Sequence, residues 1–175
     1  MFVHLLAGSL VFLLFGKVFN VEMDRMYLLL GAFWGIAPDP ISHILSWTVK
    51  FNKWSHIHRD NFSHSILFPS IVLAVAILLD CKMAIATGTA MLTHPLLDLF
   101  GIGWGVKLFY PLSQKTYKMF YRRKILTVWN QEDVDVEVRK FGNDHWVRNV
   151  YFKLNITGAS EWLSLAGFLL LIAVH

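Results

Sequence analysis

Histidine and aspartate stand four residues apart in a hydrophobic stretch that runs over residues 83–106. On a helix, His94 and Asp98 would lie one turn apart on the same face. An imidazole and a carboxylate at that spacing can bind one metal ion together. Both groups are costly to bury without partners, because an unpaired charge in an apolar segment is strongly disfavoured. The pair therefore predicts that other parts of the chain contribute polar side chains beside it.

The composition is that of an integral membrane protein. Of the 175 residues, 55% are hydrophobic and 16% charged, and the mean hydropathy is +0.49, whereas soluble domains are about 45–50% apolar. The net charge of +4 fits a partner such as anionic membrane lipid, and no nucleic acid is expected. A single cysteine excludes both an internal disulfide and a zinc site built from cysteines. The length fits one domain, residues 1–175.

The hydrophobic segments predict an all-α, polytopic bundle of four to five membrane spans. The expected spans are 1–19, 26–37 continued by 41–49, 62–79, 83–106 and 156–174. Pro38-Asp39-Pro40 should break the second span, because proline removes a backbone donor and disfavours helix before it. Ser63 is a candidate N-cap for the third span. Gly31 and Gly35 either permit a close helix approach or occur together by chance.

The region 107–155 is polar and should lie at the membrane surface, partly helical, before the last span. Residues 117–124 are basic and aromatic, which predicts a surface helix among the lipid headgroups. Residues 133–137 alternate acids with valine, as a short strand or a solvated linker would. Glu161 is an acid within the last span, and so is either functional or placed at the interface. His56, His145 and His175 are expected to be solvated.

If the N-terminus is cytoplasmic, most of the lysine and arginine residues fall in cytoplasmic loops. Because such residues are enriched on the cytoplasmic side of membrane proteins, this orientation is favoured. Alternating spans then bring seven potential metal ligands to one depth on one side of the membrane. These are His4, Asp39, His43, His58, His64, His94 and Asp98. His94 and Asp98 could instead share a hydrogen bond within their helix, His4 could be a packing residue, and His58 with Arg59 could form a basic edge among headgroups.

Such ligands suit a divalent ion, with zinc favoured, and seven candidates are enough for one or two ions. A water on the ion becomes available as hydroxide at neutral pH, and two ions can bind one phosphoryl group between them. The forked guanidinium of Arg59 suits a phosphate.

The spacing of these residues resembles a known family over residues 1–113. The matching segments are Pro38-Asp39, His58-Arg59, Ser63-His64-Ser65, His94-xxx-Asp98, Gly105 and Tyr110-Pro111. They resemble the membrane-bound metal-dependent hydrolases described as LexA-binding and inner-membrane-associated. The family's second acid falls at Ile41, its next histidine is one residue earlier than His43, and Asp60 replaces its usual glycine. His58 and His64 are six apart, where five is commoner.

The resemblance implies that Asp39, His64, His94 and Asp98 bind the main ion, with His43 and His58 as weaker matches. A more distant similarity to zinc-dependent phospholipase C implies that Asp98 bridges two ions and that His4 binds the second. We therefore expect an inner-membrane hydrolase that acts on a phosphoester or lipid-derived substrate through metal-bound hydroxide, with Asp98 and Arg59 as catalytic residues. The alternatives are a non-catalytic metal-binding membrane protein, structural or part of a transporter, and a scaffold without metal.

Overall fold

The computed structural model describes residues 1–47, 57–101, 103–140, 152 and 155–175. Its helices are α1 (Phe2–Phe19), α2 (Arg25–Ile36), α3 (Pro38–Leu45), α5 (Leu67–Leu78), α6 (Lys82–Phe100), α7 (Gln131–Lys140) and α9 (Ile156–Val174). Two short 3-10 helices, η1 (His58–Asp60) and η2 (Phe62–His64), precede α5. The strands β1 (Thr116–Tyr121) and β2 (Lys124–Trp129) form one antiparallel hairpin. The protein is therefore mostly helical, and the expectation of an all-α fold is corrected by this hairpin.

Helices α1 and α2 pack against each other through glycine. A Cβ on Gly31 would lie 2.6 Å from the carbonyl oxygen of Gly8, and one on Gly35 would meet the carbonyl oxygen of His4. The buried Ser9 hydroxyl also donates to the Leu28 carbonyl oxygen, at 2.8 Å. The structure therefore confirms that Gly31 and Gly35 permit a close approach of the two helices, rather than occurring together by chance.

The second hydrophobic segment is broken at the predicted place. Helices α2 and α3 meet at an angle of 45°, with Pro38 and Asp39 in the first turn of α3. The third segment begins differently from the prediction, because α5 starts only at Leu67 and Ser63 does not cap it. Instead Ser63 lies in η2, and its hydroxyl contacts the Pro38 carbonyl oxygen at 2.9 Å. This contact joins η2 to the break between α2 and α3.

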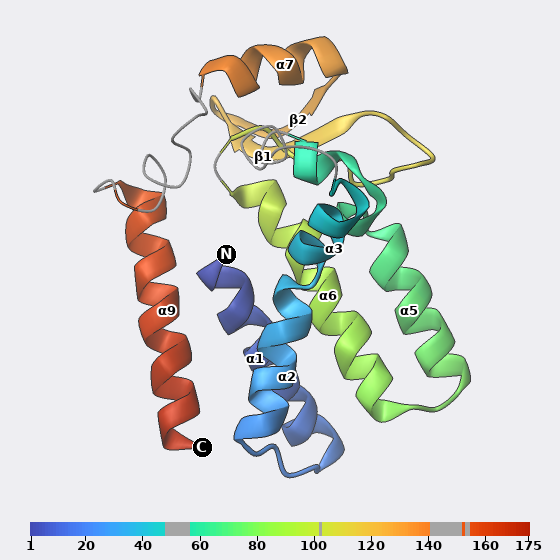
Figure 1. Cartoon of the computed structure of the whole chain (residues 1–175), viewed down its shortest axis with the longest axis vertical. Helices are drawn as coiled ribbons and strands as arrows, with labels where there is room; N and C mark the ends of the chain where they lie inside the picture. The colour runs from blue at the N-terminus through green and yellow to red at the C-terminus, as the bar shows by residue number, and fades with distance from the viewer. Residues whose placement is uncertain (48–56, 102, 141–151, 153–154) are drawn as a thin grey trace.

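Helix α6 packs against α1 and α2, α5 runs beside α6 on its far side, and α9 lies along the other side of α1 (Figure 1). Glu161 of α9 is buried and accepts hydrogen bonds from the Val3 backbone N–H at 3.1 Å and from the Met1 amino group at 2.8 Å. Its carboxylate thus satisfies free donors at the start of α1 and opposes the positive end of that helix. Glu161 therefore joins α9 to the start of α1.

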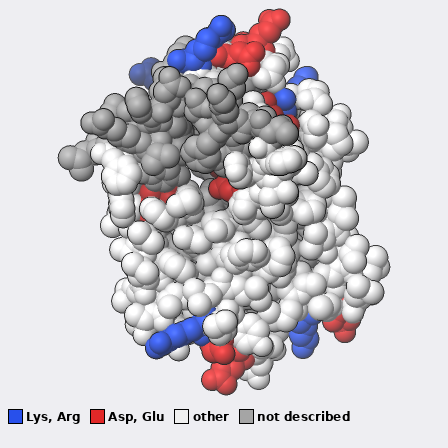
Figure 2. All heavy atoms as spheres, viewed as in Figure 1, with Lys and Arg blue, Asp and Glu red and all other residues white. Residues whose placement is uncertain are grey.

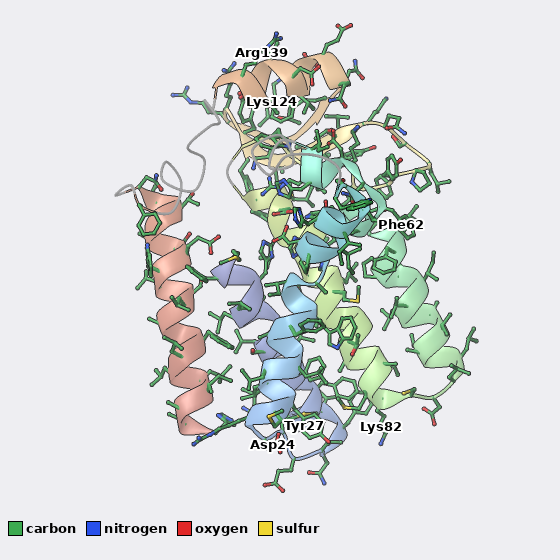
Figure 3. All side chains as sticks on the ribbon, in the orientation of Figure 1. Asp24, Tyr27, Phe62, Lys82, Lys124 and Arg139 are labelled. Atoms are coloured by element: carbon green, nitrogen blue, oxygen red, sulfur yellow. The ribbon has the colours of Figure 1, made fainter. Side chains whose placement is uncertain are left out.

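Among the described residues, α1 and α9 are long and apolar enough to cross a membrane, and the bent pair of α2 and α3 makes a third candidate. The expected four to five spans are not confirmed, because α5 has only 12 residues and α6 includes Lys82, His94 and Asp98. On the face shown in Figure 2, charged side chains gather at the two ends, and the belt between them is almost free of charge. Asp24, Tyr27 and Lys82 lie at one end, and Lys124 and Arg139 at the other (Figure 3).

The predicted surface helix at 117–124 is wrong, because these residues belong to the hairpin. Arg122 and Arg123 both have positive φ and form its turn, as two-residue hairpin turns require. The backbones of Tyr117 and Val106 exchange two hydrogen bonds of 2.9 Å, so β1 is fixed to the segment that follows α6. Pairing partners distant in the sequence thus override the local pattern.

Residues 133–137 lie in a helix, α7, and form neither the strand nor the linker that their alternation predicted. Val134 and Val138 pack against Trp104 and Trp129, and a helix places residues four apart on one such face. His56 and His145, which the sequence predicts to be solvated, lie outside the described residues.

Candidate metal centre

The ring of His94 is oriented by the broken second span. Its Nδ1 lies 2.9 Å from the Gly35 carbonyl oxygen, which can only accept a hydrogen bond. In the neutral ring Nδ1 therefore has the proton and Nε2 has the free lone pair. The close approach of α1 and α2 places this carbonyl beside α6. A backbone acceptor on the far nitrogen is the usual way in which a metal-binding histidine is oriented.

His64 is oriented by Ser63. The Ser63 hydroxyl contacts the Asn61 side-chain oxygen at 2.6 Å, the Pro38 carbonyl oxygen at 2.9 Å and His64 Nδ1 at 3.0 Å. It has one proton to donate, and the two oxygens are acceptors, so it accepts the hydrogen bond from His64 Nδ1. The lone pair of His64 is thus also on Nε2. His64 is fully buried and His94 is 1% exposed.

The two lone pairs face each other across 3.2 Å. Two nitrogens without protons repel each other at this separation unless a cation lies between them. With zinc–nitrogen bonds of about 2.0–2.1 Å, two ligands of a tetrahedral zinc are about 3.3–3.4 Å apart. The observed separation of the nitrogens therefore fits two ligands on one ion.

Two carboxylates complete this group of atoms. Asp39 Oδ1 lies 3.3 Å from His64 Nε2 and 3.7 Å from His94 Nε2. Asp98 Oδ2 lies 3.9 Å and 3.7 Å from the same two nitrogens. Asp98 Oδ2 is fully buried and has no hydrogen-bond partner among the described residues. A buried carboxylate oxygen without a donor is costly, and a cation at the centre of the four atoms would remove that cost.

His4 and His58 lie on either side of these four residues. The potential ligands form two groups of three, and within each group the ligand atoms lie within 4.8 Å of one another. The first group is His4, His94 and Asp98, and the second is Asp39, His58 and His64. His4 stacks on His94, with ring centroids 3.9 Å apart, and its buried Nδ1 lacks a hydrogen-bond partner in the described part of the chain. Burial, followed by the Arg59 charge, lowers the pKa of His58 to about 3. His58 is thus neutral, which is the form that binds metal.

Arg59 is an inward-facing side chain and does not point to the headgroups. Its Nη2 pairs with Asp98 Oδ1 at 3.0 Å, and its Nη1 donates to the Trp104 carbonyl oxygen at 2.9 Å. One oxygen of Asp98 therefore faces Arg59 while the other faces the histidines. Asp60, in the position of the family's glycine, pairs with Lys107 at 3.4 Å and joins η1 to the segment after α6.

Six of the seven predicted ligands lie together, and His43 does not. His43 is on the exposed face of α3 and belongs to neither group of potential ligands. The buried residue of that turn is Ser42, whose hydroxyl donates to the His58 carbonyl oxygen at 2.9 Å and contacts the Asn61 amide. Of the seven predicted ligands, His43 is therefore the one that the structure leaves outside the two groups.

The sequence pattern predicts no ligand-orienting role for the residues that orient the ligands, namely Gly35, Ser42, Asn61 and Ser63. It also gives no indication of Lys118, a buried lysine on β1. The polar run Asn61–Ser65 next to a histidine was the one visible signal, but a serine beside a histidine is too common a pattern to be decisive.

A helical bundle with an uncharged belt and a polar centre enclosed at one end is the architecture of an integral membrane protein. A protein-family model described as YdjM inner membrane protein matches residues 1–174, and the chain belongs to this family. The prediction of an inner-membrane protein is thereby confirmed, and the match continues past residue 113, where the recognisable motifs end. No curated protein and no solved structure matches the chain. The family description states a location and no activity.

Proposed function

We propose that this protein is a membrane-embedded, metal-dependent hydrolase that acts on a phosphoester or lipid-derived substrate. The supporting observation is the cluster formed by His64 Nε2, His94 Nε2, Asp39 Oδ1 and Asp98 Oδ2, with separations of 3.2–3.9 Å. Two neutral imidazoles and two carboxylates are a donor set that zinc prefers. The similarity of the motifs to membrane-bound metal-dependent hydrolases supports the same assignment.

The residues around the four ligands have distinct parts in this proposal. A bound divalent ion would lower the pKa of a water toward neutrality. Asp98 links the ion to Arg59, so the guanidinium is positioned to neutralise charge on a phosphoryl group. His4, which is grouped with His94 and Asp98, would hold a second ion, with Asp98 shared between the two. The surrounding hydrogen bonds of Ser63 and the Gly35 carbonyl fix the rings before any substrate binds.

The location of the cluster favours a substrate at the membrane surface. Asp39 comes shortly after the end of α2, Asp98 is near the C-terminal end of α6, and His4 is in the first turn of α1. These positions are near the end of the bundle at which the basic hairpin lies (Figure 1). The proposal includes α5 and α6 as shorter spans, for a total of five, and a cytoplasmic N-terminus, since the basic residues are concentrated at the end where the cluster lies.

A second candidate function is metal binding without catalysis, either structural or as part of a transporter. The observation that favours it is that four protein atoms already surround the centre. Structural zinc sites are filled by four protein ligands, whereas catalytic sites leave one position for water. The two functions differ in whether turnover depends on the ion.

The metal is tested first, by measuring zinc bound to the purified full-length protein after dialysis against trace zinc. His94→Ala and Asp98→Asn should each lower the zinc affinity at least tenfold, because each removes a ligand atom. His43→Ala should leave it unchanged, because His43 is exposed and outside the cluster. Wild-type zinc content in both His94→Ala and Asp98→Asn would reject the site.

Turnover is tested next on chromogenic phosphomonoesters and phosphodiesters and on labelled phospholipids. The hydrolase predicts hydrolysis that stops on chelation, returns with zinc and is lost in His94→Ala. A protein that binds zinc and shows no zinc-dependent turnover on any of these substrates would be the non-catalytic alternative.

A further inference from the structure

Lys118 is a buried cation outside the segments that resemble the hydrolase family. It is 5% exposed and lies on β1. The neighbouring Tyr117 is paired with Val106 through its backbone, and Gly105 lies so close to Tyr117 that any Cβ on Gly105 would collide with the Tyr117 carbonyl. Because side chains alternate along a strand, this pairing turns Lys118 inward, toward the end of α6.

The Lys118 ammonium reaches the same place as Arg59. Its Nζ donates to the carbonyl oxygen of Gly101, the residue that ends α6 three positions after Asp98. Arg59 Nη2 lies 3.7 Å from the point at which a side chain on Gly101 would begin. Two buried cationic side chains, from η1 and from β1, thus meet at the C-terminal end of α6.

These two cations are not equally compensated. Arg59 pairs with Asp98 at 3.0 Å, whereas no carboxylate of the described residues lies within ion-pair distance of Lys118. The Gly101 carbonyl is the one acceptor that the described residues offer to its three donor protons. A buried ammonium with a single neutral acceptor is costly. Burial lowers the pKa of Lys118 to about 8, so it is still mostly charged at neutral pH.

The charge of the whole cluster indicates what would compensate it. The negative charges of Asp39 and Asp98 balance the positive charges of Arg59 and Lys118. A divalent ion would add two positive charges that no described residue balances. A dianion of small size beside Gly101 would restore neutrality and supply acceptors to both cations.

We propose that Lys118 and Arg59 together bind the dianionic phosphoryl group of a phosphate monoester. This inference rests on the proposed function and narrows its substrate class. Lys118 contacts the phosphoryl oxygens as a point charge, while Arg59 remains anchored to Asp98 and the Trp104 carbonyl. The same chemistry is offered by a soluble phosphate monoester and by the headgroup of phosphatidic acid.

The test is equilibrium binding of radiolabelled inorganic phosphate to the full-length protein in phosphatidylcholine nanodiscs, with zinc content measured on the same samples. Lys118→Gln should weaken phosphate binding at least tenfold and leave bound zinc unchanged. Lys115→Gln is the matched control, because Lys115 is exposed three residues earlier, and it should bind phosphate within twofold of wild type. Lys118→Arg keeps the charge and should retain binding.

Equal phosphate binding by Lys118→Gln and wild type would overturn the proposal, and so would an equal loss in Lys115→Gln. If Lys118→Gln does not fold, Lys118→Met, which preserves much of the volume, replaces it with the same expected loss. Phosphatidic acid in the nanodisc and glycerol phosphate in solution are then compared as competitors, and the stronger one identifies the source of the phosphoryl group. If the protein binds phosphate at this site but shows no turnover, the hydrolase proposal is rejected and the phosphate site stands. If turnover is unaffected by Lys118→Gln, the phosphate site is rejected and the hydrolase proposal stands.

Discussion

The two central histidines, His64 and His94, are oriented by hydrogen bonds at Nδ1, the ring nitrogen that faces away from the centre of the cluster. Gly35 supplies a carbonyl to His94, and Ser63 supplies a hydroxyl to His64. Both inner nitrogens consequently face the same point, with lone pairs and without protons. It is this orientation, more than the presence of histidine, that makes the cluster a metal site in our proposal.

Ser63 should therefore affect metal affinity although it is not a ligand. Ser63→Ala removes the acceptor for His64 Nδ1 and should lower the zinc affinity about 10–100-fold. Ser65→Ala is the control, because the Ser65 hydroxyl is also in a buried residue of this segment but donates to the Leu108 carbonyl, at 3.1 Å. The measurement is a zinc competition titration with a fluorescent chelator. Equal affinities of Ser63→Ala and wild type would show that the hydroxyl does not orient the ring.

At the scale of elements, the contact between α1 and α2 supports the cluster. Gly35 lies against the His4 backbone and also presents its carbonyl to His94. Separating α1 from α2 would move His4 away from His94 and shift that carbonyl. Helix packing and ligand geometry are therefore coupled through one glycine.

Gly35→Ala should destabilise the protein by about 1–3 kcal/mol, the usual cost of overpacking, and should also weaken zinc binding. Gly167→Ala, on α9, is the matched control, because a Cβ there would lie 3.4 Å from a flexible Leu6 methyl group and should cost little. Both effects are measured in detergent, the first by chemical unfolding and the second by zinc titration. A Gly35→Ala protein as stable as Gly167→Ala would show that the helices can separate without cost.

At the scale of the whole molecule, the two ends differ in their number of basic residues. The end with the cluster and the hairpin includes Lys107, Lys115, Lys118, Arg122, Arg123, Lys124 and Arg139. The other end has Lys17, Arg25 and Lys82. This asymmetry is the basis for proposing that the cluster faces the cytoplasm.

The single native cysteine tests that orientation. Cys81 is exposed in the turn between α5 and α6, next to Lys82 at the end opposite Lys124 (Figure 3). In intact spheroplasts a membrane-impermeant maleimide should label Cys81, and should not label Lys124→Cys in a Cys81→Ser background until the membrane is opened. Labelling of position 124 alone would reverse the orientation.

The sequence determined the class of protein, the hydrophobic segments and the break at Pro38, because composition and proline act locally. It also identified Asp39, His58, Arg59, His64, His94 and Asp98 as residues that belong together. It could not separate His43 from them, since exposure of one face of α3 depends on what packs against the other. The predictions for residues 117–124 and 133–137 were wrong. The structure of these segments depends on contacts with Val106, Trp104 and Trp129, which are distant in the sequence.

Only the tertiary structure decided which atoms face the centre. The histidines are oriented by hydrogen bonds that they donate to the Gly35 carbonyl and the Ser63 hydroxyl. No spacing in the sequence reveals the first of these, because Gly35 and His94 are 59 residues apart. The structure likewise brought Lys118 from the polar region to Gly101, because strand pairing with Val106 turns it inward. The sequence specifies the residue types, but the direction in which a side chain points depends on the residues that pack around it in the fold.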